Sequence, residues 1–177
     1  MSCNLTSGRT EPCKDSVGGI KKAIFLDYIE NAFTVAAGEV TGISGDVSEV
    51  FAYELRADNN TFTESLVSDR NTGVTINTQT SEVRLKKQTY ASATEIKLMA
   101  SGRPIIVIVG YDGSYKVMGI TEGCDLTGSS IQSGGAKADF NGYDLTFTAT
   151  ETDLAPYLDQ TTITALEALV SNTNIAP

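Results

Sequence analysis

The sequence predicts one mainly β domain, because short apolar runs alternate with turn-forming residues along most of the chain. Of its 177 residues, 16 are glycine and only 4 are proline. Short apolar runs bounded by such residues are typical of β-strands, and a hydrophobic content of 41% suffices for one core. We expect a β-sandwich or half-barrel with one flanking helix, a long hairpin and extended terminal arms. The predicted parts are an N-terminal arm (1–19), a β domain (20–151) and a C-terminal extension (152–177).

Four short strands are predicted in the first third of the chain. Glycines separate several of the apolar runs, which favours tight turns between them. The expected strands are 20–28, 33–36, 40–43 and 50–55.

The pattern of residues 61–87 predicts a long hairpin, and we expect a neighbouring subunit to continue its sheet. Its second strand is apolar on alternate residues near both ends, but residues 77–81 are polar at every position. Because a strand polar on both faces gains little by packing on its own core, we expect a neighbouring subunit to continue the sheet there. Proline at Thr78 should then block assembly and leave the monomer folded. The residues assigned to this inter-subunit or lumen surface are Thr61, Phe62, Val74, Ile76, Asn77, Thr78, Gln79, Thr80, Val83 and Leu85.

One helix is predicted at 92–101, where Ser92 and Glu95 match a capping box and Gly102 ends the helix. An apolar strand at 105–109 follows it.

Asp112 and Gly113 favour a two-residue hairpin turn after that strand, before a returning strand at 115–120. The last predicted strand, 137–150, alternates large apolar side chains with threonine. After it we expect a linker at 151–161 and a short helix or tail at 164–170.

The charge of the chain excludes a nucleic-acid scaffold. The net charge is −9, and residues 104–177 hold nine acidic residues against two basic ones. Phosphate binding needs a basic face, whereas an acidic wall repels phosphates and lets DNA pass nearby. We find no apolar run of about 18 residues that would indicate a transmembrane helix and no signal peptide.

The sequence also argues against an enzyme. It has no histidine, which excludes a Ser–His–Asp or Cys–His site, and no glycine-rich phosphate loop. Two carboxylates could act as in glycosidases, but nothing selects a pair. The candidates are Asp112, Glu122, Asp125, Asp139 and Asp144. We therefore predict no catalytic residues, no cofactor and no metal.

The three cysteines, Cys3, Cys13 and Cys124, are widely spaced and are interpreted as reduced thiols. A Cys3–Cys13 disulfide or metal site is the alternative. Residues 58–61 could hold calcium, but their spacing does not match a calcium loop and a turn is the simpler interpretation.

The order of these elements resembles the tail-tube fold of long-tailed phages, which tail-terminator and ring proteins share. The matching segments are the hairpin 61–87, the helix 92–101, the hairpin 104–121 and the strand 139–151. The polar opening 3–13, with 17–20 after it, is similar to virion proteins of phages that infect Bacteroidetes, including crAss-like phages. The resemblance covers roughly residues 15–151.

This resemblance implies a structural virion protein, made in the host cytoplasm and located in the phage tail. Its expected partners are further copies in a ring of six or more subunits, other tail or portal proteins, and DNA that passes non-specifically through the lumen during ejection. No membrane partner is expected. We also expect the N-terminal arm to lie on a neighbouring subunit, since its polar composition buries little area alone. The alternative is a monomeric acidic β-sandwich that binds carbohydrate or calcium, as a receptor-binding or adhesion module.

Overall fold

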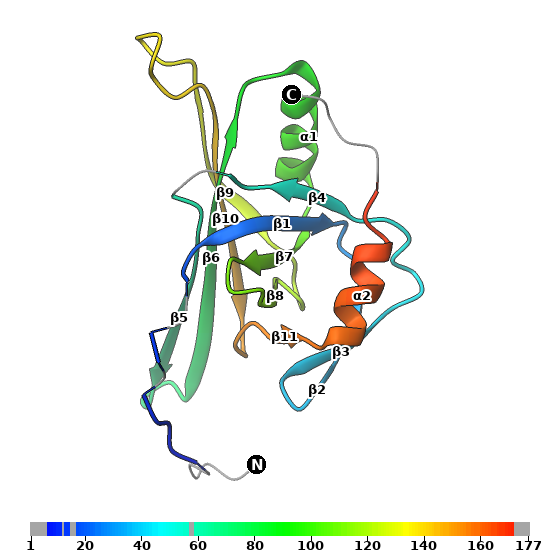
Figure 1. Ribbon diagram of the computed structural model, residues 1–177. Coiled ribbons are helices and arrows are strands. Elements are labelled where there is room, and N and C mark those ends of the chain that lie inside the picture. Colours follow the sequence, from blue (N-terminus) through cyan, green and yellow to red (C-terminus); the bar gives the residue numbers. More distant parts are fainter. Residues whose placement is uncertain (1–6, 12, 15–16, 57–58, 172–177) are drawn as a thin grey trace.

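The computed structural model describes residues 7–11, 13–14, 17–56 and 59–171. It confirms a mainly β fold built from two sheets, with one helix against the larger sheet and another beside the smaller (Figure 1). The strands are β1 (Ile20–Leu26), β2 (Phe33–Ala36), β3 (Glu39–Ile43), β4 (Phe51–Glu54), β5 (Thr61–Asp69), β6 (Val74–Lys86), β7 (Ile105–Gly110), β8 (Tyr115–Met118), β9 (Asp125–Gln132), β10 (Gly142–Glu151) and β11 (Tyr157–Leu158). The helices are α1 (Tyr90–Ser101) and α2 (Gln160–Ala168).

The two sheets differ in size and in what covers them. The larger sheet has the order β2-β3-β11-β8-β7-β1-β4 and the smaller one the order β5-β6-β10-β9. Among these described strands, all pairings are antiparallel except that of β11 with β3. The described strands form two separate sheets and no closed barrel, in agreement with the expected β-sandwich.

The central strands β1 and β7 are buried on both faces, which explains their nearly continuous apolar sequences. On one face, Phe25 and Ile106 pack with Phe147 of the smaller sheet, and the Phe25 and Phe147 ring centroids are 5.3 Å apart. On the other face, Ile24 and Val107 belong to a second core. Alternation along β10 places its large apolar residues in the first core and its threonines outside, as predicted.

Residues 158–170, where part of a linker and a short helix or tail were expected, contribute apolar side chains to this second core. Leu158 of β11 and Leu166 of α2 are 6% and 0% exposed, and the Asp159 side chain caps α2 by accepting from the Thr162 N–H at 2.6 Å. Lys22 and Tyr115 both donate to the Glu167 carboxylate. Burial alone raises the pKa of Glu167, but these hydrogen bonds outweigh it and lower the pKa below its usual value.

Helix α1 begins two residues earlier than predicted, because Thr89 and not Ser92 is its N-cap. The Thr89 hydroxyl accepts from the Ser92 N–H at 3.1 Å, and Glu95 plays no part in this cap. Ile96 is 8% exposed and packs into the core between the sheets. The helix therefore flanks the sandwich beside β9 (Figure 1).

Two further local predictions were wrong. The turn between β7 and β8 holds three residues and not two, since the Gly110 N–H donates to the Ser114 carbonyl at 2.9 Å. Gly113 has φ +84°, the left-handed conformation that the third position of such a loop requires. Strand β9 was missed because Gly128, Ser129 and Ser130 stand in its middle, and these residue types have low β propensity.

If the C-terminal segment belongs to the core, Leu166→Ala should lower the free energy of unfolding by about 2–5 kcal/mol, since it leaves a cavity. The matched control is Leu154→Ala, because Leu154 is 58% exposed and its loss should change stability by less than about 0.5 kcal/mol. Urea unfolding of both variants measures the difference. Equal stabilities would show that α2 does not contribute to the core.

Candidate assembly surface

The outward face of the smaller sheet is rich in hydroxyl groups. Register places Thr63 beside Thr80 and Thr80 beside Thr148. The next row holds Ser65, Thr78 and Thr150. These side chains are exposed or half-buried, while the residues between them in sequence point into the sandwich. Three strands therefore present two parallel rows of uncharged polar groups.

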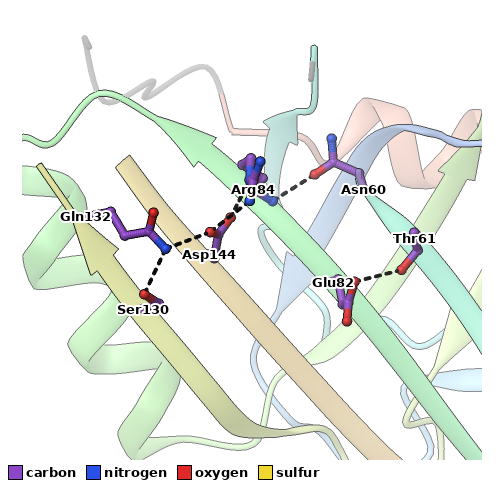
Figure 2. A network of polar contacts seen from close by, with 7 residues as sticks. All are labelled: Asn60, Thr61, Glu82, Arg84, Ser130, Gln132 and Asp144. Carbon is purple, nitrogen blue, oxygen red and sulfur yellow. Dashed lines mark hydrogen bonds and ion pairs between the residues drawn. The ribbon is translucent and has the colours of Figure 1, made fainter. Parts of the chain in front are cut away.

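The charged groups at the upper end of this face bind one another across the strands (Figure 2). The Arg84 guanidinium donates to both carboxylate oxygens of Asp144, at 2.5 and 3.0 Å. Gln132 of β9 also donates to Asp144, at 3.4 Å, and Thr61 of β5 donates to Glu82 at 3.3 Å. Such a bidentate pair is stronger than a single hydrogen bond.

The pairing with Asp144 decides what Arg84 can bind. Its hydrogen bond to Asp144 raises the pKa of Arg84 above its usual value, and its guanidinium lies 4.6 Å from the centre of the Phe140 ring. The Arg84 guanidinium therefore already binds a carboxylate through its N–H groups and an aromatic ring through one face of its plane. A passing phosphate would have to compete with both contacts.

Both edges of the smaller sheet are long. The outermost strands are β5, with nine residues, and β9, with eight. In the described part of the chain each pairs on one side alone. Such edges present unpaired backbone N–H and C=O groups that another chain can extend. Because the four strands alternate in direction, β9 and β5 run in opposite directions.

The tip of the β5–β6 hairpin extends past the rest of the sheet (Figure 1). Strand β10 ends at Glu151, opposite Asn77, so β6 residues before Asn77 have β5 as their neighbour and no third strand. Four apolar side chains there are 40–61% exposed: Leu66, Val67, Val74 and Ile76. An apolar group of this kind on a two-stranded projection is typical of a contact surface.

The ten residues assigned to the surface divide between the two faces of the hairpin. Thr61, Val74, Ile76, Thr78 and Thr80 point outward, in register with the threonine rows. Phe62, Asn77, Gln79, Val83 and Leu85 point into the sandwich or pack against its core. The second group lies in the interior and is not on the outward face.

The polar middle of β6 is explained within the chain and not by a neighbouring subunit. Its backbone pairs with β5 on one side and with β10 on the other. Asn77 and Gln79 are 0% and 1% exposed, and the Gln79 carbonyl accepts from the Gly119 N–H at 3.0 Å. The Asn77 nitrogen donates to the Glu64 carboxylate at 2.9 Å and to the Asp153 carbonyl at 3.0 Å. These partners inside the sandwich could not be revealed by sequence patterns.

A group of three interior side chains, here called the Glu64 cluster, joins the two sheets. It consists of Glu64 of β5, Asn77 of β6 and Lys116 of β8. Glu64 accepts from the Asn77 Nδ2 at 2.9 Å and from the Ala155 N–H at 2.7 Å. Its other oxygen accepts from the Lys116 Nζ at 3.4 Å.

Two aromatic rings flank the lysine of this cluster. The Lys116 Nζ lies 5.6 Å from the centre of the Phe62 ring and 4.8 Å from that of Tyr157. Burial lowers the pKa of Lys116, but interactions with Tyr157 and Glu64 outweigh it and raise the pKa. The Lys116 and Glu64 side chains are 25% and 15% exposed. Sequence analysis missed this cluster because its members are distant in sequence.

The carboxylates considered for catalysis mostly have structural partners. Asp112 accepts from Ser114 within its turn, Asp139 accepts from two N–H groups of its own loop, and Asp144 binds Arg84. Glu122 and Asp125 line a shallow, open depression together with Arg103. Among the described residues, no three acidic or cysteine side chains are grouped as a metal site would need.

The remaining predictions concern cysteines and membranes. Cys13 is exposed and Cys124 is buried, and both are free thiols; Cys3 lies outside the described residues. Within the ranges that the structure describes, no helix is long and apolar enough to cross a membrane.

Comparisons with protein-family models, curated proteins and solved structures found no match. The similarity to phage tail proteins thus stays a prediction from the sequence.

The central position of β6 changes the outcome expected for Thr78→Pro. Thr78 pairs with Ser65 and Thr150 inside the chain, so proline there should destabilise the monomer by about 3 kcal/mol or more. Urea unfolding followed by far-ultraviolet circular dichroism measures this loss. Thr10→Pro, in the exposed N-terminal arm, is the control and should leave stability unchanged. A fully stable Thr78→Pro monomer would contradict the pairing of β6.

Proposed function

We propose that this chain is a structural subunit of a phage tail tube, or of a tail or neck connector ring, in which the smaller sheet lines the lumen. The observation that carries the proposal is a four-stranded sheet with two long open edges and a hydroxyl-rich outward face. The sequence resemblance supports it independently.

Ring closure follows from the direction of the strands. Since β5 and β9 run in opposite directions, side-by-side copies related by rotation place β9 of one copy antiparallel to β5 of the next. Each added copy repeats this contact, and a closed ring leaves no free edge in the sheet. The result is a continuous antiparallel barrel with four strands from each subunit.

The outward face suits the passage of a polyanion. Threonine and serine hydroxyls form weak, neutral contacts, while free arginines would hold phosphates through bidentate hydrogen bonds. Here Arg84 is already bound by Asp144, and the chain as a whole carries a charge of −9. DNA would therefore pass along this wall without being held.

The apolar hairpin tip supplies a second contact, directed along the axis of the ring. It continues the line of β5 and β6 beyond the sheet (Figure 1), so it reaches toward whatever follows in the tail. In this proposal it contacts a further ring or another tail or portal protein.

Proline substitutions in β5 test the seam between subunits. In antiparallel pairs, the N–H groups of successive residues point alternately toward the partner strand and away from it. One of the two variants Ser65→Pro and Leu66→Pro removes a backbone N–H that donates to β6. The other removes a backbone N–H at the open edge of the sheet. Proline is tolerated where the N–H faces away from the sheet. We expect the edge variant to fold, by circular dichroism, but to remain monomeric by light scattering, while the wild type forms rings.

The control is the same pair of substitutions in β2, Val35→Pro and Ala36→Pro, at the edge of the larger sheet. The folded member of that pair should assemble normally. Assembly of the folded β5 variant would contradict a seam at β5. A wild-type chain that stays monomeric at high concentration would instead favour the binding-module alternative.

A further inference from the structure

We propose that Lys116 and Asn77 form an intramolecular amide bond that links the two sheets covalently, with Glu64 transferring the proton. The inference does not depend on the proposed function. It rests on an amine, a carboxamide and a carboxylate that the fold brings together inside the sandwich.

The three groups come from strands of both sheets. Glu64 and Asn77 lie on adjacent strands of the smaller sheet, while Lys116 lies on β8 of the larger one. The Lys116 Nζ contacts one oxygen of the Glu64 carboxylate at 3.4 Å, and the Asn77 Nδ2 contacts the other at 2.9 Å. The amine and the carboxamide therefore bind the same carboxylate. The proposed reaction requires Nζ to move from that oxygen to the Asn77 Cγ.

The Asn77 amide is held through its nitrogen, which donates to the Glu64 carboxylate and, at 3.0 Å, to the Asp153 carbonyl. Its side chain is fully buried, and its Oδ1 has no hydrogen-bond partner among the described residues. A buried carbonyl oxygen without a partner costs about 1–3 kcal/mol, so this amide is less stabilised than a solvated one. Burial also keeps water from competing with the lysine for the Cγ atom.

Glu64 is placed to move the protons that the reaction requires. The Lys116 ammonium gives a proton to the Glu64 carboxylate, and the neutral amine then attacks the Asn77 Cγ. The new C–Nζ bond forms, the C–Nδ2 bond breaks, and the leaving nitrogen takes up the proton that Nζ loses on attack and departs as ammonia. Glu64 then gives its proton to ammonia, so the net change is an ammonium side chain and a carboxamide becoming a secondary amide and an ammonium ion. No oxidant or other reactant is needed.

The proximity of the groups compensates for the small amount of neutral amine present at neutral pH. Held in contact, the two groups react at an effective concentration far above that of free solutes. The reaction also happens once in each chain and is irreversible in practice, so even a slow rate brings it to completion.

Mass spectrometry of the purified full-length chain tests the proposal. The intact protein should be lighter than its sequence by one ammonia molecule, and a protease digest should contain one branched peptide that joins the segments around Asn77 and Lys116. Lys116→Arg keeps the positive charge but cannot form the bond, so that variant should regain the full mass. The Glu64→Gln variant should have the full mass or should accumulate the linked form more slowly than the wild type.

Two controls separate this bond from other sources of ammonia loss. The dipeptide Asn141-Gly142 can lose ammonia by cyclising on its own backbone, but that loss would persist in Lys116→Arg and would give no branched peptide. Lys22→Arg changes a lysine that binds a half-buried glutamate, Glu167, and should keep the linked form. A wild-type chain of full mass after prolonged incubation, or a mass loss that persists in Lys116→Arg, would overturn the proposal.

Discussion

The pairing of β6 with β5 on one side and β10 on the other is the interaction on which the rest of the structure depends. It sets which side chains of the smaller sheet face the sandwich and which face outward, because a shift of one residue would exchange the two faces. In the observed register, Phe147 and Val83 enter the core, while Thr80 and Thr148 lie side by side outside. The Glu64 cluster lies on the inner face of the smaller sheet and the hydroxyl-rich rows lie on its outer face, so both depend on this register.

Where side-chain periodicity was strong, the sequence was sufficient to predict the elements. The apolar strands β1 and β7, the alternation in β10 and the long β5–β6 hairpin all follow from local pattern. Prediction failed where tertiary contacts decide. Strand β9 has little β propensity and exists because β10 pairs with it, and the segment after Glu151 is held by burial of Leu158 and Leu166, which local composition does not reveal.

The candidate surface was predicted in part. The hairpin and its outward threonines are visible from sequence, but the polar run at 77–81 was interpreted as polar on both faces. Its inward members are buried, and Asn77 and Gln79 bind groups from distant segments, the Asp153 carbonyl and the Gly119 N–H. A buried amide that meets its partner across two sheets looks the same in sequence as a solvated one. For the same reason the pairing of Arg84 with Asp144, 60 positions apart, could not be anticipated.

We propose that the smaller sheet extends from copy to copy and encloses a channel lined by its hydroxyl-rich face. Electron microscopy of the purified chain, at a resolution that separates the two sheets, tests this claim most directly. We expect closed rings in which the smaller sheet faces the channel and β9 of each copy lies beside β5 of the next. Rings lined by the larger sheet, or joined through β2 or β4, would contradict it.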